Sequence, residues 1–173
     1  MALVVLLRAV NVGGHNTFRP SQLAKELAEL DVVNIGAAGT LVVRKKIARA
    51  RLLETLRARL PVKAEIIVCE GRELVALADA DPFAGESAPK DETRFVTFLS
   101  KARRDLKTLP KQLPLDGPWA LKIVATQPRF VIGVYKRHQN AAAYMTQIEK
   151  RLGIPVTLRS WNTVAAIVKT LRD

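Results

Sequence analysis

The first half of the chain alternates between apolar runs and helix-spaced leucines, and this pattern predicts a definite order of strands and helices. Residues 2–10 are apolar apart from Arg8, which is typical of a strand covered on both faces. Leu23, Leu27 and Leu30 recur at helical spacing after Pro20, a residue that suits the first turn of a helix. The predicted elements are, in order, a strand at 2–10, a helix at 20–31, strands at 32–35 and 41–43, a helix at 47–60, a strand at 64–69 and a short helix at 71–78.

The same pattern then starts again. Gly85, Pro89 and several charged side chains make residues 85–92 a predicted linker. Tyr144, Ile148 and Leu152 have helical spacing, and Gly153 would end that helix. The elements predicted after the linker are a strand at 95–99, a helix at 102–109, a hairpin of strands at 119–125 and 129–135, a helix at 144–152, a strand at 156–158 and a final helix through 164–171.

Both halves therefore have the order βαββαβ followed by a helix, with equivalent elements about 90 residues apart. The simplest fold with this order is a pair of split βαβ units. We predict an α+β protein of two tandem ferredoxin-like units, each with a four-stranded antiparallel sheet and an extra C-terminal helix. The first domain would span residues 1–84 and the second residues 93–173.

Charge distinguishes the two halves. Residues 1–86 hold 12 Lys and Arg against 10 Asp and Glu, a net charge of +2, and residues 87–173 hold 16 against 6, a net charge of +10. A strongly basic half attracts polyanions, but a high charge also keeps a protein soluble. The second domain is thus a candidate for polyanion binding and equally for a merely solvated basic surface.

Composition favours a folded protein of the cytoplasm. The 173 residues are 49% hydrophobic, enough for a substantial core, and no apolar run approaches the roughly 20 residues that cross a bilayer. The single Cys69 has no internal disulfide partner and lies within an apolar strand. We therefore expect no membrane association, while the oligomeric state is left open.

The densest polar chemistry follows the first strand. Arg8 ends an apolar run, and four further candidates come within eight residues of it: Asn11, Gly13, Gly14 and Asn16. Glycines let successive N–H groups form an anion-binding nest, and the guanidinium of Arg8 could add a bidentate contact. The alternative is a Gly-Gly turn in which Arg8 pairs with a structural carboxylate. The spacing matches neither the dinucleotide-binding GxGxxG nor the Walker loop.

A second candidate lies at the start of the final helix, where Ser160, Trp161 and Asn162 follow a short strand. A helix N-terminus presents unpaired N–H groups and a positive dipole end, so a phosphate or carboxylate could bind there, beside Arg159. In the alternative interpretation Ser160 only caps the helix, Trp161 packs, and Asn162 ties down a neighbouring loop.

Nucleic-acid binding is the main competing interpretation, because RNA-recognition domains share the predicted fold. Those domains stack bases on aromatic side chains of their two central strands. The first and third strands of the first half have no aromatic residue. In the second half Phe95 and Phe98 differ in strand parity, as do Phe130 and Tyr135, so neither pair shares a face. Specific RNA binding is therefore disfavoured, whereas attraction to phosphates remains possible.

Residues for catalysis and metal binding are sparse. His15 and His138 are the only histidines, and no Ser, His and Asp grouping or HExxH sequence is present. No ligands have the spacing of a metal site, and no cofactor motif occurs. The sequence thus predicts no metal and no cofactor, and it does not decide whether the protein is an enzyme.

Two separated motifs resemble a known bacterial family. LLRAVNVGG at residues 6–14 is similar to the LLRGINVGG opening of domain of unknown function 1697, and LGIPVTLRSWNTV at 152–164 is similar to its LGVPATARNWNTV close. Asp81-Pro82-Phe83 resembles the family's NPF. Ala9 replaces a usual Gly, and Ala38-Gly39-Thr40 replaces Ser-Gly-Asn. The resemblance implies two ferredoxin-like domains in an uncharacterised protein and no particular reaction.

Three functional hypotheses follow. The leading one is binding of a small anionic ligand or partner group near the Arg8 to Asn16 loop, with a contribution from the helix start at Ser160. The second is association with nucleic acid through the basic second half. The third is a structural or adaptor protein in which both polar motifs only hold elements together.

Overall fold

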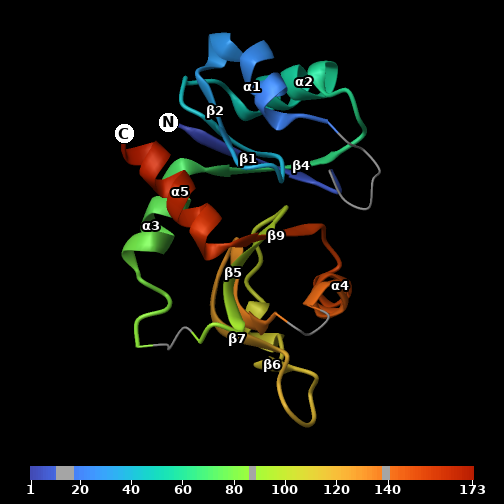
Figure 1. The fold of residues 1–173 in the computed structure, drawn as a ribbon. Coiled ribbons are helices and arrows are strands. Elements are labelled where there is room, and N and C mark those ends of the chain that lie inside the picture. The colour runs from blue at the N-terminus through green and yellow to red at the C-terminus, as the bar shows by residue number, and fades with distance from the viewer. Residues whose placement is uncertain (11–17, 86–88, 138–140) are drawn as a thin grey trace. The chain divides into compact units, whose positions relative to one another are not determined.

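A computed structural model describes residues 1–10, 18–85, 89–137 and 141–173. The described residues form a mixed α+β fold with two antiparallel sheets and five α-helices (Figure 1). Contacts divide it into two units, each described here by itself. Unit 1 comprises Met1–Asp79 with Thr163–Asp173, and unit 2 comprises Ala80–Asn162. This division differs from the predicted boundaries, because the predicted linker falls in unit 2 and the last helix falls mostly in unit 1.

The sheet of unit 1 has the strand order β2-β3-β1-β4, and all its pairs are antiparallel. Its strands are β1 (Leu3–Arg8), β2 (Val32–Ile35), β3 (Thr40–Val43) and β4 (Glu65–Glu70). Leu3 lies opposite both Val43 and Glu70, so β1 is a central strand. Residues 3–7 are buried, which explains why this strand is apolar at every position rather than at alternate ones.

Two helices of unit 1 pack on one face of that sheet (Figure 1). They are α1 (Pro20–Glu26) and α2 (Arg49–Arg59); α1 is followed by the 3-10 turn η1 (Ala28–Leu30). Pro20 lies in the first turn of α1, as predicted, because proline lacks the N–H that a first turn leaves unbonded. The core beneath the helices combines alternate strand positions with helix-spaced leucines, namely Leu3, Val5, Leu7, Leu41, Val43, Leu23, Leu27, Leu52 and Leu56.

The remaining helices of unit 1 are α3 (Gly71–Asp79) and most of α5 (Trp161–Arg172). They lie against each other, since a Cβ built on Gly71 would be 2.7 Å from the Cδ2 atom of Leu171. Arg172 also forms an ion pair with Asp79. These contacts place residues 163–173 in unit 1 although the sequence pattern assigned them to the second domain.

The sheet of unit 2 has five antiparallel strands in the order β6-β7-β8-β5-β9. They are β5 (Glu92–Leu99), β6 (Gln112–Leu113), β7 (Leu121–Gln127), β8 (Phe130–Lys136) and β9 (Val156–Ser160). The prediction of four strands was wrong here, because β6 adds a two-residue edge beside β7. The other four strands repeat the order of unit 1. Helix α4 (Ala141–Leu152) packs Ile148 and Leu152 on a core that contains Phe95, Leu121 and Val131.

The helix predicted at residues 102–109 is also wrong. This stretch has only the 3-10 turn η2 (Leu106–Thr108), with Leu106 as its buried residue. The backbone N–H of Arg103 bonds to the carbonyl of Pro128 at 2.7 Å, and its guanidinium bonds to the carbonyl of Leu152 at 2.7 Å. These long-range bonds replace the local bonds that a helix would need.

Within the described residues, no helix has both the length and the apolar character needed to span a bilayer. The longest are α4 and α5, with 12 residues each.

Candidate functional site

The polar start of α5 lines a hollow in unit 2. Ser160 is the last residue of β9, and Trp161 is the first of α5. Because β9 pairs with β5 so that Ser160 lies opposite Phe95, the end of β9 lies beside the start of β5. Ser160, Trp161 and Asn162 together border a hollow of about 370 Å³. The other residues that line it are Pro89, Lys90, Glu92, Thr93, Arg94 and Arg137.

The hollow is positively charged. Lys90, Arg94 and Arg137 contribute three cations, whereas Glu92 is the one carboxylate among the lining residues. The Nε–H of Arg137 donates to the hydroxyl oxygen of Thr93 at 3.1 Å, and its backbone N–H donates to the carbonyl of Asp91 at 2.8 Å. These two bonds hold the chain just beyond β8 against the start of β5. We refer to the nine lining residues as the basic hollow.

An aromatic and cationic cluster fixes one wall of the basic hollow. The rings of Phe83 and Trp161 meet edge to face, with centroids 5.1 Å apart and an interplanar angle of 74°. The guanidinium carbon of Arg94 lies 5.1 Å from the Phe83 centroid. Edge-to-face pairs and cation–π contacts each contribute about 0.5–1.5 kcal/mol. Phe83, which is only 3% exposed, therefore orients both Trp161 and Arg94.

Arg159 has a different role from the one its position in the sequence suggests. Successive strand residues point to opposite faces, and Arg159 is 7% exposed and absent from the lining of the basic hollow. Its Nη1 group donates to the Thr157 hydroxyl at 2.9 Å and to the Leu158 carbonyl at 2.8 Å. Burial lowers the pKa of Arg159 to about 10, so the side chain is still charged at neutral pH. Its contacts are those of a structural residue.

The first-strand candidate Arg8 is engaged with a carboxylate in unit 1. Its Nη1 group lies 2.7 Å from the Oε2 atom of Glu65, the residue opposite it on β4. This is the pairing that the structural interpretation of Arg8 requires. The other candidates of that loop lie outside the described residues, as do both histidines: Asn11, Gly13, Gly14, Asn16, His15 and His138.

Sequence reasoning missed several residues of the basic hollow. Lys90 fell in the predicted linker, and Arg94 and Arg137 lie at the ends of β5 and β8, where periodicity gives no signal. Phe83 and Trp161 both lie in motifs that resemble the family, but their contact depends on folding that joins positions 78 residues apart. The sequence did indicate the site through the helix start at Ser160 and through the +10 charge of the second half, but neither identified these three cations.

The strand register also alters the argument about aromatic residues. Phe98 lies opposite Phe130, with centroids 5.4 Å apart, and Phe95 lies near Tyr135, with centroids 5.8 Å apart. Parity within one strand correctly separated Phe95 from Phe98, but it gave no information about pairs across β5 and β8. Each face of the two central strands therefore carries an aromatic pair. Phe98 and Phe130 are 1% and 2% exposed.

The described residues include no cluster of three or more His, Cys, Asp or Glu side chains that could hold a metal ion. Cys69 is buried, and its thiol lies 3.8 Å from the carbonyl oxygen of Val4. What the basic hollow offers chemically is positive charge together with hydroxyl and amide groups. These groups can bind and orient an anion.

Comparison with known proteins agrees with the resemblance seen in the sequence. The model of the family described as Protein of unknown function (DUF1697) matches residues 1–114. The structure of the conserved bacterial protein SP0830 from Streptococcus pneumoniae is similar over 98% of both chains, with a TM-score of 0.63 and 15% identity. This likeness concerns the fold alone. No curated protein matches the chain. Because the family model covers well over half of its length, the chain belongs to the DUF1697 family of proteins of unknown function.

Proposed function

We propose that the protein binds a small anion in the basic hollow of unit 2. The observation that carries this proposal is the meeting of Lys90, Arg94 and Arg137 with Ser160 and Asn162 around one hollow that has a single carboxylate. The ligand class is the one expected from the sequence, but the proposed binding site is a different one. The site is placed at the start of α5 rather than at the Arg8 to Asn16 loop, because Arg8 is paired with Glu65.

The ligand class follows from the charges. Three cations against one carboxylate leave an excess of two positive charges, which favours a dianion such as a phosphate ester over a single carboxylate. Arginine binds phosphate oxygens through paired N–H groups, and lysine adds a point charge. The first N–H groups of the 12-residue α5 add the positive end of a helix dipole. A volume of about 370 Å³ is at the small end of the range for ligand pockets.

Phosphate titration followed by the fluorescence of Trp161 tests the proposal. A Trp119→Phe background leaves Trp161 as the only indole. We expect inorganic phosphate or a phosphosugar to change its emission at low ionic strength. The Lys90→Ala, Arg137→Ala double variant should bind about fivefold to tenfold more weakly, as expected for two partly exposed charged contacts.

The matched control is Lys101→Ala, Lys107→Ala, which removes the same charge from exposed residues of unit 2 outside the basic hollow. If both double variants lowered the affinity for phosphate equally, net charge alone would explain the effect, and the proposal would be contradicted. If the Arg8→Ala, Asn11→Ala variant lost binding and the Lys90→Ala, Arg137→Ala variant kept it, the binding site would be the first-strand loop and not the basic hollow. Absence of any response to phosphate, pyrophosphate, nucleotides, phosphosugars and acyl phosphates would overturn anion binding.

We also propose that the two units are copies of one ferredoxin-like split βαβ unit. The order β2-β3-β1-β4 is matched by β7-β8-β5-β9, and a helix follows the last strand directly in both cases. Unit 2 departs from the pattern where η2 and β6 replace the first helix. Packing of α2 and α4 on different faces of their equivalent sheets would contradict the duplication.

The second candidate function is association with nucleic acid, supported by the +10 charge of the second half. Binding should weaken steeply with salt, and removing the exposed Arg104 and Lys107 should lower the slope of log K against log salt by about 2. Arg103 is a poor probe because it is committed to Asp105 and the Leu152 carbonyl. Failure to bind single strands or duplex at low salt would exclude this candidate.

A further inference from the structure

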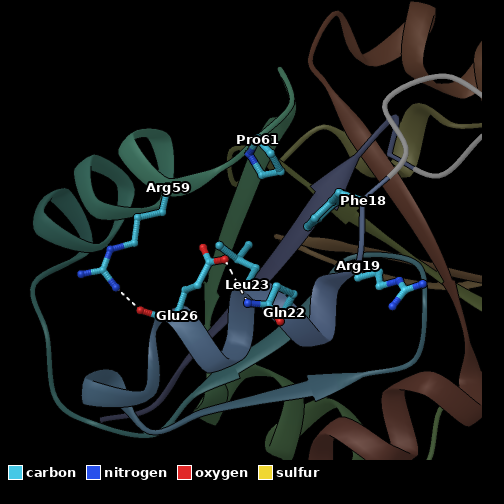
Figure 2. Close-up of a pocket in the computed structure, with 7 residues that line it drawn as sticks. All are labelled: Phe18, Arg19, Gln22, Leu23, Glu26, Arg59 and Pro61. Carbon is cyan, nitrogen blue, oxygen red and sulfur yellow. Dashed lines mark hydrogen bonds between the residues drawn. The ribbon is translucent and has the colours of Figure 1, made fainter.

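Unit 1 has its own hollowed surface, at the place where α2 ends. Arg59 is the last residue of α2, and Pro61, which lacks an N–H group, follows the helix end. One hollow of about 350 Å³ lies between the ends of α1 and α2, and Figure 2 shows the residues that line it. A second hollow, also of about 350 Å³, extends from Pro61 toward β4. Both hollows border Pro61, and the residues that line them are together called the Pro61 groove.

The floor of the Pro61 groove is apolar. Leu23 is 2% exposed and belongs to the core under α1. Phe18, Leu60, Val62 and Ala64 pack against the same core but are only partly buried. Their exposed portions and Pro61 together form an apolar surface that a binding partner can cover.

The rim of the Pro61 groove is basic. Arg19, Arg57, Arg59 and Lys63 supply four cations against the single carboxylate of Glu26. Glu26 accepts a bond from Gln22 at 3.3 Å, and its backbone carbonyl accepts one from Arg59, as Figure 2 shows. Arg59 also pairs with Glu29 at 2.8 Å. With Glu29 counted beside Glu26, the net excess at the rim is two positive charges.

The cations are spread along the groove rather than directed at one point. In Figure 2 the guanidinium groups of Arg19 and Arg59 lie on opposite sides of the hollow. Lys63 and Arg57 border the neighbouring hollow beyond Pro61. A small anion is held best where several donors converge. An elongated ligand is needed to reach charges arranged in this way and to cover the apolar floor between them.

We propose that the Pro61 groove binds an acidic and apolar peptide segment of a partner protein. Charge complementarity along the rim and apolar area along the floor support this occupant, because these two features are used in the recognition of extended peptides. Acidic side chains of the segment lie at the cations of the rim, and its apolar side chains cover Phe18, Leu60 and Pro61. This surface belongs entirely to unit 1 and is independent of the basic hollow.

The probe is a fluorescein-labelled peptide of alternating glutamate and leucine, compared with a lysine and leucine peptide of equal length. Fluorescence anisotropy at low salt should show binding of the acidic peptide only. The Arg19→Glu, Lys63→Glu variant should bind it about tenfold more weakly or worse. Hydrogen exchange of the complex should show protection at residues 18–26 and 57–64.

The matched control is Lys101→Glu, Lys107→Glu, which changes the net charge of the chain equally but lies in unit 2. Retained affinity in this control and lost affinity in the groove variant would support the proposal, provided that both variants keep the wild-type circular dichroism spectrum. If both lose affinity equally, if the wild type does not bind, or if protection falls outside the groove, the proposal is wrong. Protection of the groove by an oligonucleotide, or a dimer that the Arg19→Glu, Lys63→Glu variant dissociates, would assign the surface to another partner and overturn it.

Discussion

Phe83 and Trp161 form an edge-to-face pair with ring centroids 5.1 Å apart, although they are 78 residues apart in the sequence. Arg94 lies over the same phenyl ring. Phe83 thus links the stretch that follows α3 to the start of α5, and it orients two residues of the basic hollow. The arrangement suggests that the ring positions the site in addition to filling core volume.

Replacing Phe83 by leucine tests whether the ring positions Trp161 and Arg94 as well as filling core volume. The variant should lose about 1–2 kcal/mol of unfolding free energy, because it removes an aromatic pair and a cation–π contact. Anion affinity should fall with it, since Arg94 loses its support. Phe98→Leu is the control, because it removes a similar edge-to-face pair with Phe130 elsewhere in unit 2. Urea unfolding and phosphate titration should show similar destabilisation in both variants but weaker binding only in Phe83→Leu.

The ion pair of Arg8 and Glu65 should contribute little to stability. Their side chains are 33% and 42% exposed, and pairs of this kind contribute about 0.2–1 kcal/mol. A double-mutant cycle of Arg8→Ala and Glu65→Ala should give a coupling energy in that range, and added salt should lower it. Phosphate affinity should be unchanged. A coupling several times larger, or loss of phosphate binding in Arg8→Ala, would contradict the structural role assigned here.

Because Arg159 is buried, we expect the stability of the protein to depend on pH in the alkaline range. Burial lowers the pKa of this guanidinium to about 10 in the folded protein, below its ordinary value. Above about pH 10 the unfolded chain therefore holds more protons at this group than the folded chain does. The contribution of this group to the unfolding free energy then rises with pH, by at most about 1.4 kcal/mol per pH unit. Below that pH both states are protonated and the contribution is constant.

Urea unfolding of wild type and Arg159→Met at about pH 8 and about pH 11 measures this effect. The stability difference should move in favour of the wild type at the higher pH. The exposed Arg104→Met serves as the control for the removal of one arginine from the chain. An unchanged difference for Arg159→Met would mean that the guanidinium keeps its ordinary pKa in the folded protein.

Gly133 is required by a close approach within the sheet of unit 2. A Cβ at this position would collide with the carbonyl oxygen of Lys122 and lie 2.8 Å from the Cζ atom of Phe95. Backbone cannot move aside as a flexible side chain can, so Gly133→Ala should cost about 3 kcal/mol, the upper end of the usual range for overpacking. Gly117→Ala, where the added Cβ meets open space, should cost about 1–2 kcal/mol for its positive φ alone. Thermal unfolding of the two variants gives the comparison, and equal losses would contradict the steric account.

The sequence by itself determined most of the elements and the α+β class. The continuous apolar run of β1 indicated a central strand, and the turn glycines Gly36 and Gly39 marked the β2–β3 hairpin. These features are local: the period of apolar positions and the few residues that suit turns act over a handful of neighbours. The family is also recognised from the sequence alone, because its model matches residues 1–114.

The tertiary structure decided what no local pattern contains. Strand register placed Phe98 opposite Phe130, and long-range bonds of Arg103 replaced the predicted helix at 102–109. Contacts of Leu171 with Gly71 assigned the end of α5 to unit 1. The basic hollow likewise gathers residues from β5 and the loop before it, from the residue after β8, from the end of β9 and from the start of α5. Each outcome depends on which distant segments pack together, and the free energy of that packing is a property of the whole fold rather than of any one stretch.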